Sequence, residues 1–182
     1  MAQLGHMTAA ACSAVLALGG CSAGSVSPDA VELNNMWRAN LVPKATPSQM
    51  VGTFDRFCVN GSTDPGQAER DLRAAEYIPL PNSRTPGARA WVEDDEAPAV
   101  ALSDTMCVVA ASSRSGQTDR FRRYVAETFP QARAVDPTAL GNTIEQAWEI
   151  GGDAPFLIAT ERTPDVDWYR YMLILYRPEG RA

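Results

Sequence analysis

The last third of the chain carries the pattern that most restricts its fold, because three runs of strand-forming residues alternate there with turn residues. The runs cover 144–150, 156–161 and 168–177, and the turns cover 151–153 and 163–165. Short turns rich in Gly, Pro and Asp join neighbouring antiparallel strands. In the last run, both alternating sets of side chains are apolar over most of its length. This is typical of a strand in the middle of a sheet, covered on both sides or offering aromatic residues on an open side.

The segment that begins at Pro47 predicts a helical hairpin. Five apolar residues fall on one face of an amphipathic helix: Met50, Val51, Phe54, Phe57 and Cys58. Ser48 is the expected N-cap of this helix. Residues 60–63 break it, and Asp64-Pro65 opens a second helix, because Pro is favoured at the first helical position. The second helix turns three apolar residues inward, namely Ala68, Leu72 and Ala75.

Three further strands and one more helix lie between the hairpin and the last three strands. The strands are expected at 90–93, 100–103 and 106–110. The helix is expected at 118–129 with Thr118 as its N-cap, and it places Phe121, Tyr124, Val125 and Phe129 on one side. The predicted fold class is α+β: a helical hairpin, then an antiparallel sheet of about five to six strands with one further amphipathic helix packed on it.

The N-terminal residues have the character of an export signal. Leu18-Gly19-Gly20-Cys21 closes a small and apolar segment that starts at Thr8 and is too short to span a bilayer as a helix. The segment resembles the lipobox of bacterial lipoproteins. This resemblance implies cleavage after Gly20, a diacylglyceryl group on the Cys21 thiol and acylation of the new amino terminus. The alternative is a buried Ala/Leu helix that ends by chance in Gly-Gly-Cys.

The resemblance and the composition together predict the organisation of the chain. Residues 1–20 form a signal peptide, residues 21–46 form the lipidated Cys with a tether or docking segment, and residues 47–182 form a single α+β domain. The expected location is the bacterial cell envelope, with a lipid anchor and the domain facing the periplasm. Ser22-Ala23 lacks the Asp that commonly retains lipoproteins in the inner membrane, so the outer membrane is preferred.

Cysteine usage agrees with an exported protein. Cys12 lies in the predicted signal peptide and Cys21 is the expected lipidation site, which leaves Cys58 and Cys107. An oxidising periplasm allows these two to form a disulfide, and the alternative is two separately buried thiols. A catalytic thiol is disfavoured, because the mature chain has no His to activate it.

The region around these cysteines also resembles small exported proteobacterial domains of uncharacterised function. The residues that carry this resemblance are Phe54, Phe57 and Cys58, and later the run Cys107-Val108-Val109-Ala110. It covers about residues 47–178. It implies a disulfide-linked α+β domain and no particular activity.

Composition excludes several kinds of chemistry. His6 is the only His and leaves with the signal peptide, which excludes Ser-His-Asp, Cys-His and His-zinc sites from the mature chain. Lys44 is the only Lys. The net charge of -6 argues against nucleic-acid binding and gives no attraction to anionic membranes. We predict no catalytic residue, no metal ligand and no cofactor.

One turn is the best candidate for a ligand site. Ser113, Arg114, Ser115 and Gly116 join a predicted strand to a predicted helix. Backbone N–H groups and the helix dipole favour an anion at such a place, and Arg114 adds positive charge. The turn lacks the glycine spacing and lysine of a nucleotide-binding P-loop. The pattern favours an ordinary capped turn, and the anion site is the alternative.

Two other groups of residues have a possible binding role. Residues 93–96 are four consecutive carboxylates, which either hold a hard cation or form a solvated turn. Tyr169 and Tyr171 lie on one side of the last strand. With Trp168 or Trp148 they would form a platform for sugar rings or a partner protein, and the alternative is that they belong to the sheet core.

These observations leave two classes of function. The first is a non-enzymatic envelope lipoprotein that binds a partner protein or a small ligand while its acyl chains attach it to the membrane. The second is a hydrolase that acts on envelope polymers through paired carboxylates, since Asp and Glu are the abundant acid and base groups. We expect the first, because it requires no catalytic set.

Overall fold

The computed structural model describes residues 44–81, 83, 87–94, 97–113, 117–152, 154–164 and 169–177. The helical elements are α2 (Pro47–Phe54), the π-helix η1 (Asp55–Val59), α3 (Pro65–Ala74), α4 (Gln117–Thr128) and the 3-10 helix η2 (Pro137–Ala139). The strands are β1 (Ile78–Pro79), β2 (Arg89–Val92), β3 (Ala99–Leu102), β4 (Met106–Ser113), β5 (Arg133–Val135), β6 (Ile144–Ile150), β7 (Phe156–Pro164) and β8 (Tyr169–Tyr176).

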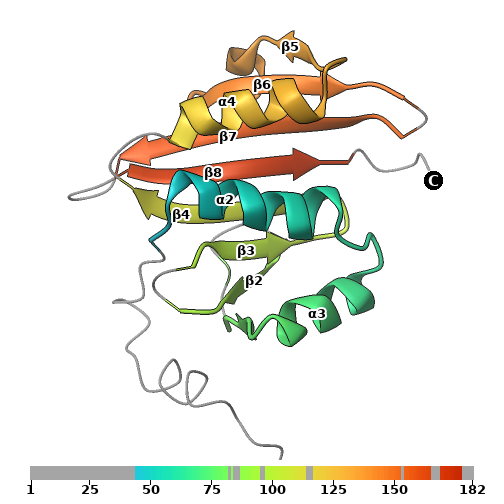
Figure 1. The fold of residues 1–182 in the computed structure, drawn as a ribbon, viewed down its shortest axis with the longest axis vertical. Helices are drawn as coiled ribbons and strands as arrows, with labels where there is room; N and C mark the ends of the chain where they lie inside the picture. Colours follow the sequence, from blue (N-terminus) through green and yellow to red (C-terminus); the bar gives the residue numbers. More distant parts are fainter. Residues whose placement is uncertain are drawn as a thin grey trace, which may run out of the picture.

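Within these residues the strands form one antiparallel sheet of eight strands, in the order β1-β2-β3-β4-β8-β7-β6-β5 (Figure 1). The sheet consists of two meanders, β1 to β4 and β5 to β8. They meet where β4 pairs with β8 over eight residues of each strand, from Met106 opposite Tyr176 to Ser113 opposite Tyr169. The predicted meander of the last three long strands is confirmed. Its final strand, β8, lies in the middle of the sheet, as the apolar character of both its faces indicates.

The fold class α+β is confirmed, but the predicted number of strands is too low. All six predicted strands are present, and β1 and β5 are added at the two edges of the sheet. These edge strands have two and three residues, and neither forms an alternating apolar pattern. Strands this short gain their structure from the neighbour that they pair with, so local sequence does not reveal them.

Helix starts differ from the predicted N-caps at two places. Thr46, not Ser48, caps α2: its hydroxyl accepts from the Gln49 N–H at 3.2 Å, and the Gln49 side chain accepts from the Thr46 N–H at 2.8 Å. This reciprocal pair places Pro47 at the first helical position, where a missing N–H has no cost. Thr118 is not an N-cap either, because α4 already includes Gln117. The predicted start of α3 is confirmed, with Asp64 as its N-cap and Pro65 following.

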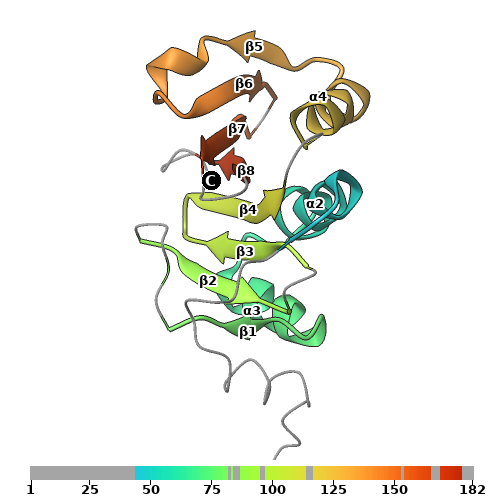
Figure 2. The ribbon, with the colours of Figure 1, turned by 90° about the vertical axis from the view of Figure 1, so that its left-hand side faces the viewer.

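The helices cover one face of the sheet (Figure 2). The main core lies between them and that face. It includes Phe54 and Leu72 from the helices and Trp91, Val109 and Leu175 from the strands, and all five are 1 % exposed or less.

A smaller apolar cluster lies on the opposite face. Ala90, Ala101 and Val108 form its centre, and partly buried Leu80 and Met172 pack against them. The alternation of apolar residues to both faces follows from strand geometry, since successive side chains point to opposite sides. In the described part of the chain, no helix has the length and apolar character needed to cross a bilayer.

Tyr77 is buried where the chain passes from α3 to β1. Its side chain is 4 % exposed, and its hydroxyl donates to the Pro98 carbonyl at 3.0 Å. Burial, aided by the charge of Glu93, raises the pKa of Tyr77 from 10.0 to about 12. The unfolded chain therefore ionises first as the pH rises. The stabilisation linked to this group is complete below pH 10 and is lost as the pH rises through about 12.

We expect Tyr77→Phe to flatten the alkaline decline in stability. A shift of this size corresponds to roughly 2–3 kcal/mol of unfolding free energy lost by the wild type across that pH range. The variant loses the hydrogen bond to Pro98, but it has no phenol to ionise at this position. Urea unfolding, measured in steps from neutral to strongly alkaline pH, gives both curves. Parallel declines in wild type and variant would contradict the assignment.

Candidate functional site

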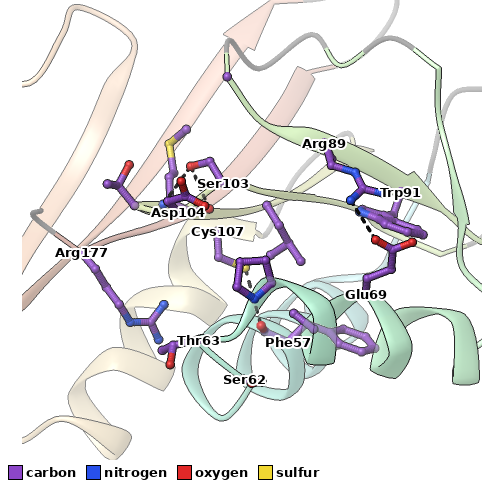
Figure 3. Close-up of a pocket in the computed structure, with 16 residues that line it drawn as sticks. Phe57, Ser62, Thr63, Glu69, Arg89, Trp91, Ser103, Asp104, Cys107 and Arg177 are labelled. Carbon is purple, nitrogen blue, oxygen red and sulfur yellow. Dashed lines mark hydrogen bonds and ion pairs between the residues drawn. The ribbon is translucent and has the colours of Figure 1, made fainter. Parts of the chain in front are cut away.

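A cleft of about 400 Å³ opens beside the main core, between the η1–α3 segment and the ends of strands β2, β3 and β4 (Figure 3). Its lining combines apolar, hydroxyl and charged side chains. The polar and charged members are Ser62, Thr63, Glu69, Arg89, Ser103, Asp104, Thr105 and Arg177. The cleft is thus assembled from segments that are far apart in the sequence.

A disulfide joins the two walls of this cleft. Cys58 in η1 is bonded to Cys107 in β4, with 5.4 Å between their Cα atoms, which confirms the predicted pairing. Both residues are buried, at 1 % and 3 % exposure. Gly61 follows η1 so closely that a Cβ there would lie 2.1 Å from the Phe57 carbonyl oxygen, so only glycine fits this turn. The bridge and the tight turn hold the η1 wall in place.

One end of the cleft is occupied by a network of two arginines and one carboxylate. Arg73 and Arg89 both contact the Glu69 carboxylate, at 2.9 and 2.8 Å, and both guanidinium groups lie over the Trp91 ring. The hydrogen bonds from Arg73 and then Arg89 hold the pKa of the Glu69 carboxyl below its ordinary value. Glu69 therefore stays ionised, and its charge is matched by two cations.

The other end holds Arg177, which follows β8 (Figure 3). Its backbone N–H donates to the Thr105 carbonyl at 2.7 Å, and its guanidinium donates to the Cys58 carbonyl at 2.9 Å. Burial lowers the pKa of this guanidinium from its ordinary value. Within the described residues Arg177 has no carboxylate within ion-pair distance, although the exposed Asp104 also lines the cleft.

The one described residue of the predicted ligand turn, Ser113, lies away from the cleft, at the opposite end of β4. Ser113 is the last residue of β4 and pairs with Tyr169 of β8, while residues 114–116, which include the predicted Arg114, Ser115 and Gly116, lie outside the described residues. The structure does not bring Ser113 to the cleft. Cys21, the predicted lipidation site, also lies outside the described residues.

For the aromatic residues considered as a platform, the structure favours the alternative, in which they belong to the sheet core. Tyr171 is 5 % exposed and belongs to the main core, and Trp148 packs against that core at the Phe121 ring. Tyr169 is 40 % exposed, but the Arg162 guanidinium lies over its ring at 4.9 Å. Both tyrosines point to the helix-covered side of the sheet, which is why one of them is buried. Trp168 lies outside the described residues.

Acidic residues form no metal site in the described part of the chain, where no group of three or more potential ligands gathers. From the acidic run, Glu93 and Asp94 are described, and the Asp94 carboxylate accepts from the Ala97 N–H at 2.8 Å. This contact is that of a turn in which a side chain satisfies the backbone.

Sequence reasoning missed the residues that line the cleft. Glu69 and Arg73 at i and i+4 form a helix pair that the sequence does contain. Arg177 carries no such local signal, because it reaches the cleft only through the pairing of β8 with β4.

Comparisons with known proteins identify no relative for this chain. No protein-family model, no curated protein and no solved structure matches it.

Proposed function

We propose that the chain is a lipid-anchored lipoprotein of the bacterial cell envelope whose domain is a binding module. The lipobox-like residues 18–21 support the anchor, with Cys21 as the lipidated residue. The acyl chains then hold the domain at the membrane surface on the periplasmic side, with the outer membrane preferred. The cleft at the disulfide is the observation that carries the binding role.

The form of the cleft supports a small ligand. Its volume of about 400 Å³ falls within the range of small-molecule sites in proteins. Its two walls are linked by a covalent bond between η1 and β4, which fixes their relative position, so the space is preformed. A preformed site loses less conformational entropy when a ligand binds.

The alternative role, a carboxylate-dependent hydrolase, has less support from this site. The described lining contains two carboxylates, Glu69 and Asp104. Such hydrolysis requires one carboxyl group that is protonated before the reaction and donates a proton to the leaving group. Glu69 is tied to Arg73 and Arg89 and has a lowered pKa, so it does not suit that role. Within the described lining, this leaves the exposed Asp104 as the one candidate for the proton donor, so hydrolysis has less support than binding.

The proposal predicts both a modification and a retained ligand. We expect native mass spectrometry of the full chain, expressed in a bacterial host and purified from its membranes, to show acylation at Cys21. We also expect a non-covalent small molecule from an envelope extract to remain bound. Thr63→Trp should abolish this retention, because Thr63 lines the cleft. Thr143→Trp, at an equally exposed residue before β6, should not.

The lipid anchor and the binding role of the cleft can be contradicted by separate results. An unmodified Cys21 in membrane-extracted protein would contradict the anchor. A wild-type protein that retains nothing, or a Thr63→Trp variant that retains the same molecule as wild type, would contradict the binding role of the cleft.

A further inference from the structure

Arg177 has an unusual position for a cation. Its side chain is partly buried at the mouth of the cleft and, within the described residues, is not paired with a carboxylate. Removing a cation from water without a partner costs free energy, so such groups normally have a counter-charge. The other cleft cation, Arg89, does have one in Glu69.

The hydrogen bond from Arg177 to the Cys58 carbonyl partly explains why this guanidinium is partly buried. Carbonyl groups in the last turn of a helix lack intrahelical partners, and a basic side chain often satisfies them. This contact uses one N–H of the guanidinium. A guanidinium carries five N–H donors arranged as a planar fork, so capping leaves donor capacity for a second acceptor.

The surroundings of Arg177 provide further donors. The hydroxyl groups of Ser62, Thr63 and Thr105 line the same cleft. In Figure 3, Arg177 stands at one end of the cleft, and the Glu69–Arg89 pair stands at the other. Among the described residues, the end near Arg177 is therefore the one where a negative group meets a cation that has no carboxylate partner.

We propose that the cleft binds a small ligand through an oxyanion group, a carboxylate or a phosphate, that is held by the Arg177 guanidinium. This inference rests on the proposed binding function and names the ligand chemistry of the same site. The planar fork of Arg matches two oxygens of either group. The desolvation of Arg177 strengthens that contact, because electrostatic attraction grows as water is excluded.

Inorganic phosphate and acetate are the probes that test this inference. The full chain is labelled with 15N and titrated with each ion, and the arginine Nε–Hε resonances are followed by NMR. The resonance of Arg177 is assigned as the one that is missing from the spectrum of Arg177→Gln. We expect a saturable shift of the Arg177 resonance. A response to one ion only would identify the group as phosphate or carboxylate. No shift with either ion would overturn the inference.

Three variants make the test specific to this residue. Arg177→Gln should weaken binding by about tenfold or more. Arg133→Gln, which removes the same charge from the exposed edge strand β5, should change it by less than about twofold. Asp104→Asn should strengthen binding by about twofold or more, because it removes a like charge from the cleft lining. Weaker binding by Asp104→Asn would contradict the inference.

Helix capping is the competing role for Arg177, and the same variants separate the two. If Arg177 acts as a cap only, Arg177→Gln lowers the melting temperature while anion affinity is unchanged, and the inference is wrong. Should Arg177→Gln fail to fold, Arg177→Lys keeps the charge and the capping donor, and we expect it to bind with reduced affinity because it lacks the fork. If Arg177→Lys bound the anion with the affinity of wild type, the claim that the planar guanidinium recognises the anion would be wrong.

Different experimental results would contradict the proposed function and this inference. A ligand that is retained from envelope extract and lost in Thr63→Trp, together with no response of Arg177 to either ion, would leave the binding role intact and remove the oxyanion inference.

Discussion

Replacing both Cys58 and Cys107 with alanine is expected to lower the free energy of unfolding by about 4 kcal/mol. The disulfide closes a loop with a sequence separation of 49 residues, and opening a loop of this length gives the unfolded chain that much additional conformational freedom. Both sulfurs are buried, so the alanines also leave small unfilled spaces next to Phe57 and Val109 of the core. The native stability of an ordinary domain is of similar size, so the variant should be close to unfolding at body temperature.

Equilibrium unfolding in urea measures this loss. The matched control is Ser48→Ala, an equally small substitution at an exposed residue outside the closed loop, and it should leave the unfolding free energy within about 0.5 kcal/mol of wild type. A loss below about 1 kcal/mol in the double variant would contradict a stabilising bridge. Free thiols at both positions in non-reduced wild-type protein would contradict the bridge itself.

Replacing Cys58 and Cys107 should also affect the walls of the cleft. Cys107 and Phe57 both line it, and the disulfide is the covalent link between the η1 wall and the β4 wall. Without the bridge, the η1 wall is held by packing and by hydrogen bonds such as that from the Tyr124 hydroxyl to the Asp55 carboxylate. We infer that the position of the Cys58 carbonyl, which accepts from Arg177, depends on the bridge as well.

The central part of the sheet could be predicted because its strands carry their own signals. β6, β7 and β8 are long, and turn residues separate them. β8 is apolar on both faces, which indicates a central position. What local sequence does not contain is the partner of β8 on its other side. That partner is β4, and the pairing joins residues 56 to 70 positions apart.

The error at the start of α2 has a physical cause. Thr46 and Ser48 stand on either side of Pro47, and each has a hydroxyl that suits an N-cap. The choice between them is decided by the residue three positions later. For Thr46 that residue is Gln49, whose side chain returns a hydrogen bond to the Thr46 N–H and completes a capping box.

The candidate site was harder to predict than the fold. The prediction of the ligand turn depends on a strand that leads directly into a helix, which is a local pattern. The cleft depends instead on Glu69, Asp104 and Arg177, which come from a helix, a turn and the end of the last strand. Their proximity is a product of the sheet order, and no spacing in the sequence expresses it.

Replacing Phe121 with alanine should be the other severe change, with a loss of about 3–5 kcal/mol in unfolding free energy. Phe121 is fully buried and joins α4 to α2 and to the sheet. Its ring lies 5.1 Å from that of Phe54, 5.6 Å from Tyr124 and 6.2 Å from Trp148. The substitution removes one partner from three aromatic contacts and leaves a cavity that three elements border.

Phe129→Ala is the matched control, because it removes the same side chain from a partly buried position just after α4. Its loss should be clearly smaller, since less surface is withdrawn from water there. A double-mutant cycle of Phe121→Ala with Phe54→Ala should show a coupling of about 0.5–1.5 kcal/mol, the usual value for an edge-to-face pair. Equal losses for Phe121 and Phe129, or no coupling between Phe121 and Phe54, would show that α4 is not attached to α2 through this ring.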